Sequence, residues 1–359
     1  MNMRRKFAIL QEGDQLPDEP TIFADGTIPA LYRKGFDLEL SHWLPNHTPF
    51  ELKADTSTEI CINFYLSDLD EDQQLVTNNH VDTDGLLSIF ALLFPELSQE
   101  NREVLINAAS MGDFGAFGDE DSLKLWTSLV STLHKTRHAS PQAAYQEGIK
   151  TVLEVLNGEN SYQAQFNESS AALDRARRWL DEEKIKRFEI LPRFTHFHIP
   201  RTLIDANPGL TPYFEPNFDS GVEIHHILPR QIRNQQDGQK NQLLSIEEDG
   251  GHSYDLLLPQ YMWAETPDSW RFPGLYSRGS ANGYYLQRPD LLEAVETLNR
   301  REKNRGSWIL ATEINPFNSV GGRGFPVILS FIQEGGATPS SLEPEEVVGI
   351  LKEPLSLEE

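Results

Sequence analysis

One short stretch constrains the fold of this chain more than any other. Residues 75–81 predict a strand, and residues 86–94 predict a buried helix that ends before a proline. A strand that leads into a helix is the βα unit of an α/β fold with a parallel sheet. His80, Asp82 and Asp84 stand where the predicted strand ends and the helix begins. They therefore stand at the carboxyl end of a strand, where ligands bind in such folds.

These three side chains favour a divalent metal site. Mg²⁺ and Mn²⁺ prefer carboxylate oxygen, and Mn²⁺ also accepts imidazole nitrogen. A Gly-rich loop at residues 110–119 could return to the same place, which makes Asp113 a fourth predicted ligand and Asp119 a further candidate. The alternative for Asp84 is a helix N-cap, because Asp accepts hydrogen bonds from the N–H groups of the first helical turn.

The rest of the chain divides by its periodicity. Residues 59–66 alternate and predict a strand, after which helical patterns dominate as far as residue 186. From residue 187 onward strand patterns dominate. We therefore predict an α/β fold that consists of a parallel-sheet N-terminal domain, residues 1–186, which carries the metal-binding tip, and a strand-rich α+β domain, residues 187–334, which binds substrate. The remaining residues, 335–359, predict an acidic, disordered tail.

Charge and composition limit the kinds of partner that this chain can bind. The formal net charge of −24 at pH 7 repels long nucleic acid, so a small molecule or a short nucleotide is the expected substrate. Cys61 is the only cysteine, which excludes an internal disulfide and a thiolate zinc cluster. No apolar run is long enough to span a bilayer. We expect a cytoplasmic protein without a membrane partner. The sequence leaves open whether the chain forms a homodimer.

The metal-binding tip resembles a known motif. Residues 79–91, Asn-His-Val-Asp-Thr-Asp-Gly-Leu-Leu-Ser-Ile-Phe-Ala, look like the first motif of the DHH phosphoesterase superfamily, which includes single-strand exonucleases, oligoribonucleases and inorganic pyrophosphatases. The resemblance implies a two-domain α/β phosphoesterase that uses two Mn²⁺ or Mg²⁺ ions in a cleft. It makes Asp82 and Asp84 metal ligands and places His80 on or near the metal. Residues 109–113 are similar to a later segment of that family and make Asp113 a ligand.

Two later segments extend the resemblance. His225 and His226 lie in a segment similar to the Asp-His-His motif, with Ile224 where the family has Asp, and they become candidate catalytic residues. Residues 318–324 resemble a Gly-rich substrate loop. Successive backbone N–H groups at Gly321 and Gly322 could form an anion nest, with Arg323 as the charge partner of a substrate phosphate.

Two other functions remain open. His196 and His198 share one face of a predicted strand and could join Glu223 and the His225–His226 pair in a site for Fe, Zn or Mn. With Fe²⁺ this would resemble a non-haem iron oxygenase that acts on a small molecule. The other alternative is a catalytically inactive DHH-like binding protein that keeps the fold without the metals. The leading hypothesis is a metal-dependent phosphoesterase-like hydrolase.

Overall fold

A computed structural model of the chain shows two compact units. Unit 1 is built mainly from Met1–Ser170 and includes Glu265 from later in the chain. Unit 2 takes most of the chain from Ala171 onward. The structure describes residues 3–15, 18–67, 75–159, 161–214, 224–266, 279–280, 283–285, 289–311, 313–314 and 319–356.

Unit 1 is organised around a parallel sheet. Its strands have the order β1 (Lys6–Phe7), β4 (Leu75–Thr77), β2 (Thr21–Ala24) and β3 (Leu38–Leu40). Every pairing between them is parallel. The predicted parallel-sheet α/β class of the N-terminal half is confirmed. Strand β4 is shorter than predicted, because the chain leaves the sheet after Thr77.

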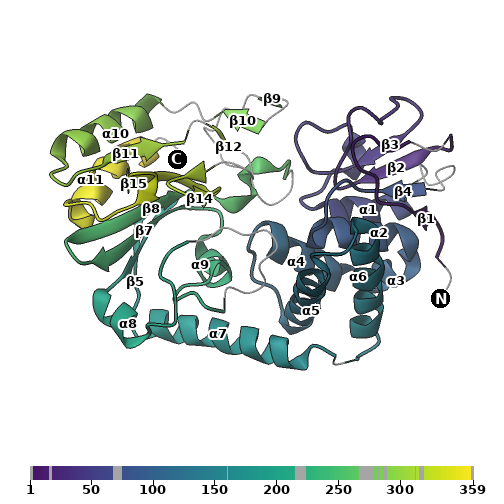
Figure 1. The fold of residues 1–359 in the computed structure, drawn as a ribbon, viewed down its shortest axis with the longest axis horizontal. Helices are drawn as coiled ribbons and strands as arrows, with labels where there is room; N and C mark the ends of the chain where they lie inside the picture. The colour runs from purple at the N-terminus through teal and green to yellow at the C-terminus, as the bar shows by residue number, and fades with distance from the viewer. Residues whose placement is uncertain are drawn as a thin grey trace. The chain divides into compact units, whose positions relative to one another are not determined.

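Helices pack around this sheet (Figure 1). All the residues of α2 are buried, which agrees with the apolar character of the predicted central helix. Gly148 of α6 lets that helix approach α2 closely, since a Cβ there would lie 1.9 Å from Cδ1 of Leu86. The helices are α1 (Ser57–Tyr65), α2 (Thr83–Leu93), α3 (Pro95–Glu100), α4 (Arg102–Asp113), α5 (Glu120–Thr136) and α6 (Pro141–Leu156), with a short 3₁₀ turn at Phe50–Leu52.

The strand predicted at residues 59–66 is wrong, because this segment is helix α1. Thr56 is its N-cap, and the Thr56 side chain accepts a hydrogen bond from the backbone N–H of Glu59 at 3.1 Å. A Thr followed three residues later by Glu is the capping-box pattern of a helix start. The alternating apolar residues also include the helical spacing of Ile60 and Phe64, so alternation alone misled the prediction.

Unit 2 contains a larger mixed sheet. The strands have the order β11-β15-β8-β7-β6-β5, and β16 pairs with β15. Only β6 and β7 pair in parallel within this sheet, so the predicted strand-rich α+β half is confirmed. The bounds are β5 (Lys186–Leu191), β6 (Phe194–Ile199), β7 (Asn241–Glu248), β8 (Gly251–Leu257), β11 (Ser307–Leu310), β15 (Val327–Gln333) and β16 (Gly336–Ala337).

Shorter elements complete unit 2. Helices α10 and α11 pack together and contact this sheet (Figure 1). The helices are α8 (Arg201–Ala206), α9 (Arg230–Asp237), α10 (Pro289–Arg301) and α11 (Pro344–Ser356), with a 3₁₀ turn at Gln260–Trp263. Short strands are β9 (Gly279–Ser280), β10 (Gly283–Tyr285), β12 (Glu313–Ile314), β13 (Ser319–Val320) and β14 (Arg323–Gly324).

The disordered tail predicted for residues 335–359 is wrong over its described part. Strand β16 and helix α11 occupy most of this segment. Val347, Leu351 and Leu355 are buried and stand four residues apart, so they form one apolar helix face among the acidic residues. The composition that suggested disorder concealed this spacing.

The change from helices to strands falls at β5, which begins at Lys186, whereas the two compact units divide inside helix α7 (Gln163–Asp181).

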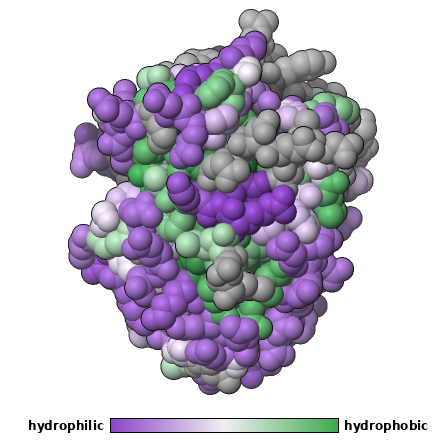
Figure 2. Space-filling view, turned by 90° about the vertical axis from the view of Figure 1, so that its right-hand side faces the viewer, coloured by the Kyte–Doolittle hydropathy of each residue, from purple (hydrophilic) through white to green (hydrophobic). Residues whose placement is uncertain are grey.

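None of the helices in the described residues combines the length and the apolarity that crossing a bilayer requires. The face drawn in Figure 2 carries mostly hydrophilic side chains with separate hydrophobic patches, as expected for a chain with a formal charge of −24.

Candidate metal centre

Three neighbouring parallel strands bring polar side chains to one edge of the unit 1 sheet. Asp25 directly follows β2, His42 follows β3, and His80 follows β4. The carboxyl ends of parallel strands lie at the same sheet edge, which explains how segments distant in sequence meet there. Two groups of potential metal ligands form at this edge, and both include Asp25.

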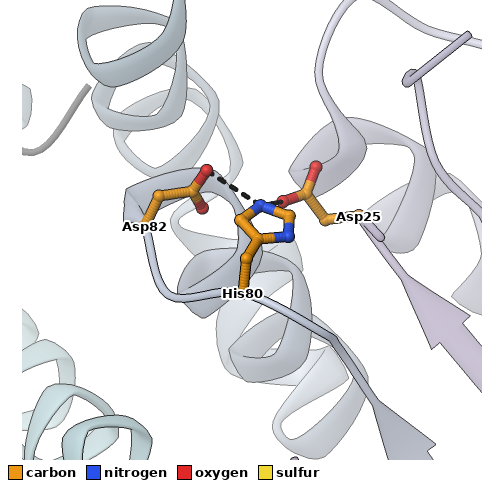
Figure 3. Close-up of side chains that lie close together, drawn as sticks. All are labelled: Asp25, His80 and Asp82. Carbon is orange, nitrogen blue, oxygen red and sulfur yellow. Dashed lines mark hydrogen bonds and ion pairs between the residues drawn. The ribbon is translucent and has the colours of Figure 1, made fainter. Parts of the chain in front are cut away.

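The first group, called the outer group, consists of Asp25, His80 and Asp82. The Nε2 atom of His80 lies 3.0 Å from Oδ2 of Asp25 and 3.0 Å from Oδ2 of Asp82. Figure 3 shows the His80 ring between the two carboxylates. The other oxygen of Asp82 accepts a hydrogen bond from the N–H of Gly85 at 2.8 Å and so caps helix α2. The His80 side chain is 31% exposed, so solvent reaches this group.

The second group, called the inner group, consists of Asp25, His42 and Asp84, and Asp113 adjoins it. The Nε2 atom of His42 lies 3.6 Å from Oδ1 of Asp25, 3.5 Å from Oδ2 of Asp84 and 3.3 Å from Oδ2 of Asp113. All four side chains are buried. The two Asp25 oxygens therefore face different imidazoles, one from each group.

His42 and His80 both present Nε2 to the carboxylates, because Nδ1 of each ring is already hydrogen-bonded to a carbonyl oxygen. Nδ1 of His42 lies 2.7 Å from the backbone carbonyl of Asp55, and Nδ1 of His80 lies 2.7 Å from Oδ1 of Asn79. A carbonyl oxygen can only accept, so Nδ1 carries the proton in each ring. This arrangement is common in metal-binding histidines, where a hydrogen bond at one nitrogen orients the other toward the metal.

The N-terminus of α1 holds the Asp84 carboxylate. Oδ2 accepts from the backbone N–H of Ser57 at 2.9 Å, and Oδ1 accepts from the N–H and the hydroxyl of Thr58 at 2.9 and 2.6 Å. A helix N-terminus favours negative charge through its free N–H groups and its dipole. Helix α1 thus fixes the orientation of a carboxylate that belongs to α2.

The electrostatics of the centre reflect an excess of carboxylates. Burial raises the pKa of Asp25, but the hydrogen bond from His80 and the charges of His80 and His42 outweigh it and hold this pKa below its usual range. Burial lowers the pKa of His42, yet the hydrogen bond with Asp113 and the charges of Asp84 and Asp113 raise this pKa to about 10. The centre therefore favours positive charge at His42.

The pKa values of Asp84 and Asp113 are raised because several carboxylates are buried close together. Burial and then the charge of Asp25 raise the pKa of Asp84 to about 6. Burial and then the charge of Asp84 raise the pKa of Asp113 well above its usual range. Asp113 also stands at the last residue of α4, where the helix dipole disfavours an anion. Like charges buried together destabilise each other unless a cation neutralises them.

The structure brings together all four residues predicted as metal ligands, His80, Asp82, Asp84 and Asp113. Two local assignments differ from the prediction. Asp113 ends helix α4 and does not lie in a loop, and Asp82, not Asp84, caps α2. Asp119, the further candidate, is exposed and caps helix α5 (its Oδ1 accepts from the N–H of Ser122 at 2.8 Å).

The residues of the predicted histidine site belong to unit 2. His196 and His198 share a sheet face, as predicted, and both lie against the hydroxyl of Ser245, at 2.7 and 3.0 Å. Burial and the neighbouring imidazoles of His198 and His252 lower the pKa of His196 to about 4. Among the described residues, ligand groups of three or more form only in the outer and inner groups.

The described residues around His225 and His226 form no strand. Ile224 to Leu228 form a turn, with one isolated bridge between Thr211 and His226. His225 is exposed and His226 is buried. Glu223, the carboxylate predicted beside them, lies outside the described residues.

Gly321 and Gly322 form the turn between β13 and β14, and both have positive φ angles, 60° and 79°. This is the backbone conformation that glycine adopts without strain. Nε of Arg323 lies 2.8 Å from Oδ2 of Asp255, a buried carboxylate. Asp255 thus neutralises the charge of Arg323 within unit 2. Substrate binding by this loop stays a prediction.

Sequence reasoning missed Asp25 and His42. Asp25 carried the same kind of signal as the predicted tip, because the strand-forming residues Thr21–Ala24 are followed directly by Asp25 and Gly26. His42 follows a strand of only three residues and carried no comparable signal.

Comparison with known families gives one result. Residues 4–193, more than half of the chain, match the family of unknown function DUF6687. This span contains every residue of the outer and inner groups. Comparisons with curated proteins and with solved structures found no match. The chain belongs to the DUF6687 family.

Proposed function

We propose that unit 1 is a metal-dependent phosphoesterase that holds two divalent cations, one in the outer group and one in the inner group, with Asp25 shared between them. One observation carries the proposal: the two Asp25 oxygens face different imidazoles, Oδ2 toward His80 at 3.0 Å and Oδ1 toward His42 at 3.6 Å. A carboxylate shared in this way can bridge two ions.

The donor set fits divalent cations. In each group the ligand atoms lie within 4.8 Å of one another, and a carboxylate-rich site with imidazole suits Mn²⁺ better than Mg²⁺, which prefers oxygen alone. Fe²⁺ is the alternative ion. A pair of such ions, when bound, can lower the pKa of water and stabilise the charge that develops in a displacement at phosphorus.

The residues of the chain assign different tasks to the two groups. The inner group is buried and orients the shared carboxylate, while the outer group, with His80 31% and Asp82 11% exposed, is open to a substrate. The indole of Trp43 donates to Oδ1 of Asp25 at 3.2 Å, and its ring lies 5.4 Å from that of His80. Trp43 therefore restricts the motion of both. The proposed substrate is a phosphorylated small molecule or a short nucleotide.

The resemblance of residues 79–91 to the DHH phosphoesterases supports the same reaction class. The competing function is that of a binding protein in which protonated His42 and His80 neutralise the carboxylates without metal. The raised pKa of both histidines is compatible with this alternative. The two functions differ in metal content, which makes them separable.

The test is hydrolysis of bis(p-nitrophenyl) phosphate and of a short oligonucleotide by the purified full chain with added Mn²⁺. We expect Mn²⁺-dependent hydrolysis by the wild type and a loss of at least about 100-fold in Asp82→Ala, since Asp82 would hold the outer ion. Asp119→Asn is the matched control, because Asp119 caps a helix outside the centre. Wild-type protein that binds Mn²⁺ without hydrolysing either substrate, or full activity in Asp82→Ala, overturns the phosphoesterase assignment.

A further inference from the structure

Two buried side chains from different elements hold the backbone of His80. The hydroxyl of Tyr145, on α6, donates to the carbonyl of His80 at 3.0 Å. The same hydroxyl accepts from Nδ2 of Asn78 at 2.8 Å. Oδ1 of Asn78 accepts from the N–H of Asn79 at 2.6 Å and, more weakly, from the N–H of His80 at 3.4 Å. The Asn78–Tyr145 pair thus binds the loop on both sides of the His80 backbone.

The surroundings define the position of this hydroxyl closely. Asn78 and Tyr145 are both fully buried, and buried hydrogen bonds are stronger than exposed ones and costly to leave unmade. A Cβ at Gly85 would lie 2.2 Å from Nδ2 of Asn78 and 2.8 Å from the Tyr145 hydroxyl. The first turn of α2 therefore closes against the pair. Little room remains for the loop to shift.

The two groups of the centre depend on different supports. Asn78 and Tyr145 support His80, which belongs to the outer group only. The described hydrogen bonds of the inner group run elsewhere: His42 binds the carbonyl of Asp55, and Asp84 binds the N-terminus of α1. A change at Tyr145 should therefore affect one group and spare the other.

We infer that Tyr145, together with Asn78, is a positioning residue for the outer ion alone, so that loss of one buried hydroxyl converts a two-ion centre into a one-ion centre. The inference rests on the proposed function, since it presumes that both groups bind cations. Residues that orient metal ligands typically change the affinity for the metal 10- to 100-fold when they are replaced.

The experiment is titration of the metal-free full chain with MnCl₂, followed by calorimetry and by the electron paramagnetic resonance of bound Mn²⁺. In Tyr145→Phe, which keeps the ring, we expect one ion bound as in the wild type and the other weakened 10- to 100-fold, so that only one ion is bound at an Mn²⁺ concentration that just fills both wild-type sites. The resonance of a coupled Mn²⁺ pair should change to that of an isolated ion. A merely structural role would not change the stoichiometry in this way.

Tyr254→Phe is the matched control. Tyr254 is a buried residue of unit 2, and its hydroxyl donates to the carbonyl of Leu342 at 2.6 Å. The control loses a comparable hydrogen bond and should bind both ions like the wild type. Asn78→Ser breaks the Asn78–Tyr145 pair from the other side and should also give a one-ion protein.

The outcomes separate the inference from the proposed function. If Tyr145→Phe binds both ions with wild-type affinity, the inference is overturned and the proposed function stands. If Tyr145→Phe and Asn78→Ser both lose the two ions together, the inference is overturned as well, because the pair then supports the whole centre. If the wild type binds no Mn²⁺, both fail.

Discussion

The Nε2 atom of His80 lies 3.0 Å from Oδ2 of Asp25, although the two residues follow different strands, β4 and β2. The strands are neighbours in a parallel sheet, so their carboxyl ends deliver both side chains to one point. The other Asp25 oxygen faces His42, which follows β3 on the far side of β2. Asp25 thus lies in the middle of the centre, and the first prediction concerns this residue.

Asp25→Asn should reduce bound Mn²⁺ in both groups, whereas Asp82→Asn should affect the outer group alone. The reason is that Asp25 belongs to both groups and Asp82 to one. Metal content after dialysis against Mn²⁺, measured by elemental analysis, checks this. Asp119→Asn is the control and should retain the wild-type content. Two ions in Asp25→Asn would show that this carboxylate is not shared.

Gly85→Ala should destabilise unit 1 by about 1–3 kcal/mol, because the new Cβ would overlap the buried Asn78–Tyr145 pair. Gly349→Ala, in helix α11, is the control. A Cβ at Gly349 meets nothing within 4 Å, so the alanine should stabilise that helix by up to about 1 kcal/mol. Urea unfolding of both variants gives the comparison. Equal stability of Gly85→Ala and wild type would contradict the packing around Asn78.

His196 should make the free energy of unfolding depend on pH. Its pKa in the folded protein is lowered to about 4 from 6.5, first by burial and then by His198 and His252. The unfolded chain therefore takes up the proton first, so this contribution to stability is complete above pH 6.5 and is lost as the pH falls toward 4. The full loss is on the order of 3 kcal/mol.

Urea unfolding at several pH values between 7 and 4 tests this dependence. His196→Gln should flatten the decline relative to the wild type, because glutamine does not titrate. His134→Gln is the control, since His134 lies in unit 1 at the exposed end of α5. An unchanged pH profile in His196→Gln would show that another group causes the decline.

Glu302→Gln should destabilise unit 2 at neutral pH by about 1–2 kcal/mol. The Glu302 carboxylate accepts hydrogen bonds from the N–H groups of Ser341 and Asn304, at 2.9 and 2.8 Å, and from nearby hydroxyls. Burial raises the pKa of Glu302, but the hydrogen bonds from Ser340 and Ser341 outweigh it and lower this pKa from 4.5 to about 2. The stabilisation is therefore present above pH 4.5 and is lost as the pH falls toward 2.

Unfolding of Glu302→Gln and wild type at pH 7 and at pH 3 tests the sign, since the difference between them should shrink at the lower pH. Glu346→Gln is the control. It removes a half-exposed ion pair with Arg301, which should change stability by less than about 1 kcal/mol. A difference that grows as the pH falls would rule out the ionised form of Glu302 as the source of the stability.

Local patterns predicted part of this molecule. Strand β4, the polar tip and the buried helix α2 were recognised because each depends on neighbours within a few residues. The same reasoning failed for α1, where alternation and helical spacing coincide at Ile60 and Phe64. It also failed for α11, where acidic residues concealed an apolar face. Both segments carried local helix signals, the Thr56–Glu59 capping box and the four-residue spacing of Val347, Leu351 and Leu355, but alternation and acidic composition were given more weight.

By itself the sequence determined that His80, Asp82 and Asp84 stand where a strand gives way to a buried helix. Only the tertiary structure decided that Asp25 and His42 join them. Strand β2 lies between β4 and β3 in the sheet, although β4 comes after β3 in the chain. Which strand ends meet is set by this order and by the helices that pack against the sheet. Neither can be read from the spacing of residues along the chain.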